Sequence, residues 1–84
     1  MHDLHAADKI LKLALEKGRE NKLKKITKIV IELGEIIEHG QRITPKNLEF
    51  NIKMLAEDTP AKNAKIIIHS TKGNIFTLKE IYGD

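Results

Sequence analysis

The spacing of the apolar residues changes along this chain, and that change most constrains the fold. Between residues 3 and 21 they recur every three or four positions, which predicts an amphipathic helix. Between residues 24 and 35 they alternate with polar residues, which predicts a strand with one dry face, closed by Gly34. A chain that switches period in this way is expected to stack helix against sheet.

The first predicted helix has boundaries that can be read from the sequence. Asp3 can cap its start, and Gly18 to Asn21 supply a stop. Its apolar stripe consists of Leu4, Ala7, Leu11 and Ala14, with Ala6, Ile10 and Leu13 beside them. The dry face of the strand that follows consists of Thr27, Ile29, Ile31 and Leu33.

The second half of the chain predicts one more helix and two more strands. Thr44 is expected to cap the helix, with Pro45 at its first position, and Pro60 bars continuation. Its stripe is Leu48, Ile52 and Leu55, with Phe50 and Met54 beside it. Strands are expected in 64–70 and 74–82. Because Gly73-Asn74 suits a hairpin turn, we expect Ile66 and Ile68 to face Leu78 across an antiparallel pair. The stretch 35–43 is expected to be a loop, and its sequence does not predict the loop's conformation.

The element order α-β-α-β-β predicts an α+β two-layer sandwich, with two helices on one face of a three-stranded sheet. At 84 residues, the chain is expected to form a single domain, 1–84. It has no cysteine, which excludes disulfides, zinc ribbons and thiol nucleophiles. Packing alone must therefore stabilise the fold, and we expect it to need no metal.

Several function classes find little support. No apolar run approaches the roughly 18 residues of a membrane helix, and no signal peptide is visible, so the cytoplasm is the expected compartment. The net charge is +3, with basic residues gathered in 17–25. No aromatic residue interleaves with them to stack on bases, so we interpret this segment as a solvated helix end rather than a nucleic-acid site.

Nothing in the sequence predicts an enzyme. Ser70 is the only serine, and a strand would point its side chain away from that of the adjacent His69. There is no glycine-rich phosphate loop. The four candidate acidic residues, which no motif brings together, are Glu32, Glu35, Glu38 and Glu49.

The opening residues "MHDLH" allow a metal site. A bulky second residue usually spares the initiator methionine, so the Met1 amine, the His2 amide nitrogen and the His2 imidazole can chelate one ion. Such nitrogen-rich sets suit nickel(II) and copper(II), and Asp3 adds its amide or its carboxylate. The positive end of the helix dipole opposes a cation there, whereas the unpaired first amides favour one. The alternative is a frayed end ahead of a helix, with His5 facing solvent.

The whole pattern resembles the nickel-binding domain of the hydrogenase and urease nickel-incorporation family HypA. Members typically begin Met-His-Glu-Leu, as Met1 to Leu4 do here with Asp3 in place of Glu. The first strand ends in Gly34-Glu35, and "PKNLEF" is similar to the family's Pro-x-x-Leu-x-Phe. "AKNAKIII" looks like the strand that enters the family's zinc module, and "FTLKEIYGD" like its final strand.

This resemblance implies a nickel metallochaperone that assists maturation of a hydrogenase-type nickel enzyme. It implies nickel(II) held by Met1, His2 and Asp3, and a maturation GTPase or a nickel-enzyme precursor as partner. The family's zinc module, with its paired Cys-x-x-Cys motifs, is replaced here by a short turn near 70–74, so no zinc is expected. A longer loop adds Glu38 and His39. The alternative is a metal-free interaction module derived from the same family, which docks a maturation GTPase or another partner.

Overall fold

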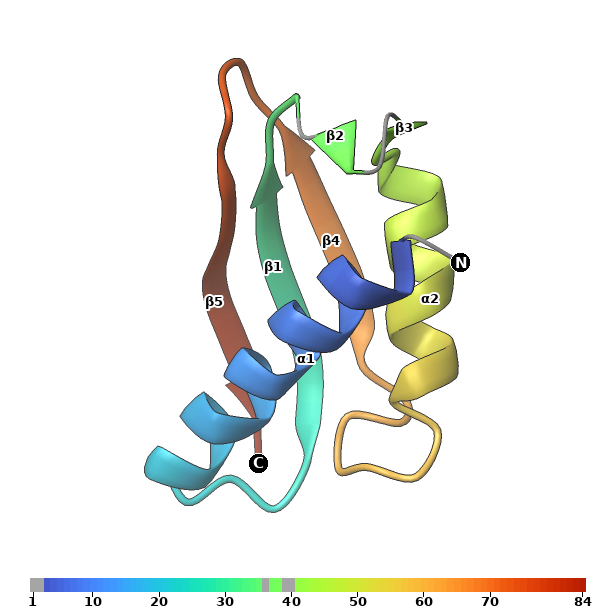
Figure 1. Ribbon diagram of the computed structural model, residues 1–84. Coiled ribbons are helices and arrows are strands. Elements are labelled where there is room, and N and C mark those ends of the chain that lie inside the picture. Colours follow the sequence, from blue (N-terminus) through green and yellow to red (C-terminus); the bar gives the residue numbers. More distant parts are fainter. Residues whose placement is uncertain (1–2, 36, 39–40) are drawn as a thin grey trace.

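The computed structural model describes residues 3–35, 37–38 and 41–84, which form two layers (Figure 1). The elements are α1 (Asp3–Glu20), β1 (Ile26–Leu33), β2 (Ile37–Glu38), β3 (Gln41–Arg42), α2 (Pro45–Leu55), β4 (Lys65–Ser70) and β5 (Phe76–Gly83). Strands β4, β1 and β5 form a three-stranded sheet, and both helices pack over one face of it. The predicted α+β two-layer fold is confirmed. The loop after β1 adds a short antiparallel ladder of β2 and β3.

Both helices bury the stripes that their sequences predict. In α2, the Thr44 hydroxyl accepts a hydrogen bond from the Asn47 backbone amide at 3.3 Å, and Pro45 takes the first helical position. Leu48 and Ile52 are completely buried. In α1, the buried residues are Ala6, Ala7, Ile10, Leu11 and Ala14. The residues predicted beside the stripes are less well buried: Leu13 of α1 has an exposed fraction of 41%, and Phe50 and Met54 of α2 have 66% and 48%.

The predicted hairpin pairing of β4 with β5 is wrong. Strand β4 pairs in parallel with β1, and β5 pairs antiparallel with the other edge of β1. The sheet order is therefore β4-β1-β5, and α2 forms the crossover between the two parallel strands. Ile29, Ile31 and Leu33 are buried on the face that the helices cover, as the sequence predicted. Val30 is buried as well, although it lies outside that core cluster.

The start of β1 also departs from the predicted alternation. Thr27 is exposed, whereas Ile26 is buried. The pairing with β5 shifts register between Ile26 and Lys28, so the side chains there no longer alternate in simple order. The Thr27 hydroxyl instead donates a hydrogen bond to the Tyr82 carbonyl oxygen at 3.2 Å.

The segment between β4 and β5, residues 71–75, crosses over the end of β1. The Thr71 amide donates to the Leu33 carbonyl at 2.9 Å, and the Glu35 amide donates to the Gly73 carbonyl at 2.8 Å. Gly73 has a φ of +90°, in the left-handed region that favours glycine, as the sequence predicted. The turn therefore bridges two strands that are not neighbours in the sheet.

Replacing Gly73 with valine should lower the free energy of unfolding by about 1 kcal/mol or more. No atom lies within 4 Å of a Cβ built at this position, so the cost comes from the backbone conformation rather than from a clash. Urea denaturation of the two proteins measures the difference. Equal stability would mean that this turn adopts another conformation.

Candidate metal site

The predicted ligands lie at the very start of the described chain. Met1 and His2 lie outside the described residues, and so does His39. Asp3 is the first residue of α1, at the position where the sequence predicts the helix to start, but its side chain and that of His5 are outside the description. The ligand set of Met1, His2 and Asp3 therefore stays a prediction, and the structure supplies its immediate surroundings.

The beginning of α1 is held firmly against the rest of the molecule. Ala6 and Ala7 have exposed fractions of 3% and 0%, and α1 packs directly on α2. Figure 1 shows the first described turn of α1 beside α2. The first amides of a helix have no intrahelical acceptor, so the N–H groups at this helix end are left for other partners. His2 directly precedes this helix start in the sequence.

Several charged side chains of the described residues are paired at the surface. The Lys12 ammonium lies 3.0 Å from the Asp8 carboxylate on α1, and the Arg42 guanidinium lies 3.8 Å from Glu35. Exposed pairs of this kind contribute less than about 1 kcal/mol each. Pairs this weak do not hold their side chains as a rigid set of ligands for a cation.

Elsewhere in the described ranges the side chains form no metal cage. No three His, Asp or Glu residues come together among the residues that the structure describes. His69 is exposed on the sheet face that the helices leave uncovered, next to Glu32, and Glu32 pairs with Lys79 at 3.8 Å. The structure thus offers no rival site to the amino terminus within the part of the chain that it describes.

A polar cluster on the uncovered sheet face was not predicted from the sequence. The Lys28 ammonium lies 4.6 Å from the centre of the Tyr82 ring, and the Tyr82 hydroxyl donates a hydrogen bond to the Glu80 carboxylate. That hydrogen bond and the negative charge of Glu80 raise the pKa of Tyr82 above its ordinary value of 10.0. Glu80 and Tyr82 lie two residues apart on β5, and the pairing of β1 with β5 brings Lys28 beside Tyr82.

The basic segment 17–25 is a helix end followed by a turn, as the sequence predicted. Lys17 pairs with Glu20 at 3.7 Å, and the Asn21 side chain donates to the Lys17 carbonyl at 2.8 Å. Lys22 has a φ of +58°, the left-handed conformation that commonly ends a helix.

Neither helix in the described ranges is both long and apolar enough for a membrane span.

Chelation should leave the fold intact. The core is a cluster of buried apolar side chains from both helices and from β1 and β4, and partly buried side chains of β5 pack against it. We therefore expect its stability not to depend on a metal. We expect a strong chelator to leave the thermal midpoint of the protein unchanged. A fall of several degrees in a thermal melt with excess chelator would contradict this prediction.

Comparisons of this chain with known proteins all match members of one family. The family model for HypA, described as hydrogenase/urease nickel incorporation metallochaperone, matches residues 1–77. The hydrogenase maturation factor HypA of Methanocella arvoryzae is 31% identical over 68 residues, covering 81% of this chain and 57% of that protein. The HypA of Legionella pneumophila strain Lens is 29% identical over 73 residues, covering 87% and 61%.

A solved structure shares the fold. The solution structure of the Ni metallochaperone HypA from Helicobacter pylori superposes with a TM-score of 0.71 at 17% identity. The match covers 95% of this chain and 72% of that one. The chain thus spans less than two thirds of the length of the two sequence relatives named above, and 81% and 87% of it take part in these matches.

Proposed function

Because this chain belongs to the HypA family of nickel-incorporation proteins, we propose that it carries nickel(II) to a hydrogenase-type enzyme under maturation. The observation that carries the proposal is the family match, which begins at residue 1 and extends to residue 77. In this role the chain is a cytoplasmic carrier, not an enzyme, and nickel is its cargo. Its partners are a maturation GTPase or the precursor of the nickel enzyme.

We place the cargo at the amino terminus, on Met1, His2 and Asp3. An amine, an amide nitrogen and an imidazole in sequence form the nitrogen-rich donor set that nickel(II) accepts well. The start of α1 supports this assignment, because Ala6 and Ala7 anchor the helix one turn after Asp3. Only the short segment ahead of the helix would then need to close around the ion.

The segment 71–75 is the proposed replacement for the family's zinc module. It joins β4 to β5 directly, and the chain has no cysteine to hold zinc. Nickel binding and zinc binding would then be separable functions, of which this chain keeps the first. The hydrogen bonds from Thr71 and Glu35 hold the shortened connection onto β1.

Calorimetric titration of nickel(II) into the untagged protein tests the proposal. We expect one ion per chain, and we expect His2→Ala to abolish specific binding. His69→Ala is the matched control, because His69 is exposed on the sheet face away from both helices. Should the native chain bind no nickel while it still binds a maturation GTPase, it would be a metal-free interaction module of the same family.

A further inference from the structure

Two hollows lie side by side where the chain enters β1. One has a volume of about 200 Å³ and is mainly apolar, and the other has about 540 Å³ and is basic. Ile26 and Pro60 line both of them. The apolar hollow lies against the last turns of α1, so the pair is at the opposite end of that helix from the proposed nickel ligands.

The apolar hollow has the size of a site for one side chain. Leu15 and Leu23 line it and are half-buried, so part of each side chain stays open to a partner. Its volume is below the roughly 300–1,000 Å³ of pockets that hold small-molecule ligands. It therefore suits a single large apolar group rather than a cofactor.

The basic hollow carries an excess of positive charge. Lys24, Lys25 and Lys62 line it and are exposed, and Asp84 is the one acidic residue among the described residues that line it. None of the three lysines takes part in an ion pair within the described part of the chain. Their charge is thus available to an anionic partner.

Hydrogen bonds of the backbone hold the walls of both hollows in place. The Ile26 amide donates to the Pro60 carbonyl at 3.1 Å, which ties the connection between α2 and β4 to the start of β1. The Lys24 amide donates to the Asp84 carbonyl at 2.7 Å, and the Asp84 amide donates to the Lys25 carbonyl at 3.1 Å. A surface that is already formed loses little conformational entropy when a partner binds.

We infer that the two hollows together dock a segment of a partner protein in which one large aliphatic side chain is flanked by acidic residues. The aliphatic side chain enters the apolar hollow, and the carboxylates meet Lys24, Lys25 and Lys62. No aromatic residue of the described chain lines either hollow, so bases of a nucleic acid would find nothing to stack on. The inference rests on the proposed function only in taking the partner to be a protein that the carrier serves.

Fluorescence anisotropy with a labelled synthetic peptide tests the inference. In this peptide a single leucine is flanked on both sides by glutamates. It should bind the native chain, and the affinity should fall at least about tenfold as salt rises from about 0.05 to about 0.5 M, because salt screens exposed charges. A second peptide with serine in place of leucine should bind at least about tenfold more weakly, because it buries no apolar side chain.

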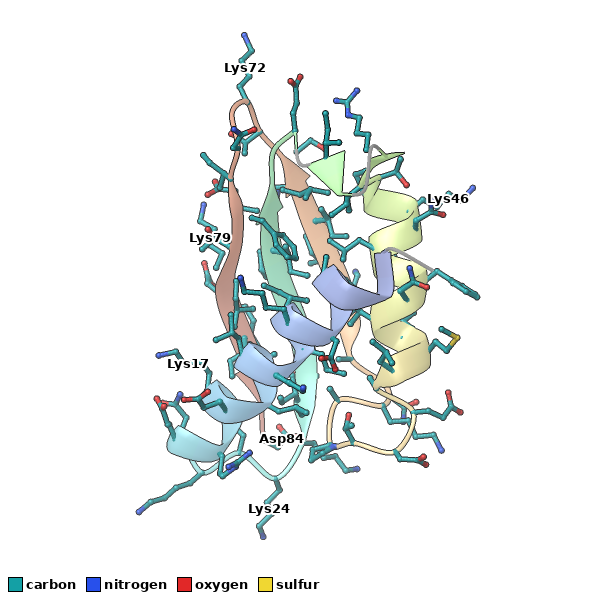
Figure 2. All side chains as sticks on the ribbon, in the orientation of Figure 1. Lys17, Lys24, Lys46, Lys72, Lys79 and Asp84 are labelled. Carbon is teal, nitrogen blue, oxygen red and sulfur yellow. The ribbon has the colours of Figure 1, made fainter. Side chains whose placement is uncertain are left out.

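Paired charge reversals locate the contact. Lys24→Glu together with Lys62→Glu should weaken binding of the leucine peptide at least about tenfold. The matched control is Lys46→Glu together with Lys72→Glu, which changes the net charge equally. Figure 2 shows Lys46 and Lys72 far from Lys24. The control should weaken binding less than about threefold, and both double variants should keep the thermal midpoint of the native chain.

The same assay separates this inference from the nickel proposal. His2→Ala should bind the leucine peptide as the native chain does, whether or not the native chain binds nickel(II). A native chain that binds neither peptide, or both equally, would overturn the inference, and so would two double variants that weaken binding alike. Tighter binding of a random-sequence DNA duplex than of the leucine peptide would also overturn it and assign the basic hollow to nucleic acid.

Discussion

Two residues added ahead of Met1 should weaken nickel(II) binding at least about a hundredfold, which corresponds to about 3 kcal/mol. The extension replaces the terminal amine with a peptide nitrogen and moves the chain end away from His2. The chelate of amine, amide and imidazole then becomes a histidine in mid-chain. Competition with a chromophoric chelator measures both affinities on one scale.

The matched control adds the same two residues after Asp84, where they should leave the affinity unchanged. Asp3→Ala should cost less than His2→Ala if the carboxylate is a secondary donor. A chain extended at its amino end that binds nickel as tightly as the native chain would refute the terminal-amine site. His5 and His39 would then be the next candidate ligands for nickel(II).

The same site predicts how nickel binding depends on pH. Protons compete with the metal for the imidazole, whose ordinary pKa is about 6.5, so affinity should fall as the pH drops below that value. The Met1 amine, whose ordinary pKa is about 8, and the His2 amide also release protons on binding, so the affinity should begin to fall below about pH 8 and fall more steeply once the imidazole is protonated. Affinities measured at several pH values test this, and a flat profile would exclude histidine as a ligand.

Local signals in the sequence were enough to predict both helices. Thr44 and Pro45 mark the start of α2 because a hydroxyl cap and a missing amide each satisfy the helix end directly. The stripes of α1 and α2 are periodic over several turns, which is why Leu48 and Ile52 were predicted correctly as core residues. These features depend on residues within a few positions of one another.

The order of the strands depends on contacts that no local pattern records. Gly73 does adopt the left-handed conformation that its turn predicts, but that turn joins β4 to β5 across the end of β1. One available signal was the uninterrupted run Ile29, Val30 and Ile31, which is typical of strands in parallel sheets. The other was the presence of α2 between β1 and β4, as a parallel crossover requires.

The candidate site was predictable only through the resemblance to the family. A histidine at position 2 has too many ordinary explanations to indicate a metal by itself. Four motifs in the family's order, in contrast, make nickel(II) the expected metal ion. The fold adds the firm helix start at Ala6 and Ala7. The contact of Lys28 with the Tyr82 ring escaped prediction because it depends on strand register, whereas Glu80 and Tyr82 lie two residues apart on one strand.

Gly34→Ala should be far more damaging than any change within the turn that covers it. Gly34 is buried at the end of β1, and a Cβ there would overlap the Gly73 carbonyl oxygen and lie 2.9 Å from the Ile75 nitrogen. Both obstacles are backbone atoms, so the segment 71–75 must move and release its hydrogen bonds to Gly34 and Glu35. We expect a loss of about 2–4 kcal/mol in the free energy of unfolding.

Gly73→Ala is the matched control for Gly34→Ala. It separates the cost of a steric clash with backbone atoms from the cost of placing alanine in a backbone conformation that favours glycine. A Cβ at Gly73 meets no atom within 4 Å, so only its φ of +90° opposes the change, at a cost of about 1 kcal/mol. Urea and thermal denaturation of both variants give the comparison, and Gly34→Ala should lower the thermal midpoint by about 10 °C or more. If the two variants were equally stable, the connection between β4 and β5 would not rest on β1. The close backbone approach at Gly34 is thus what allows so short a connection to join the two outer strands.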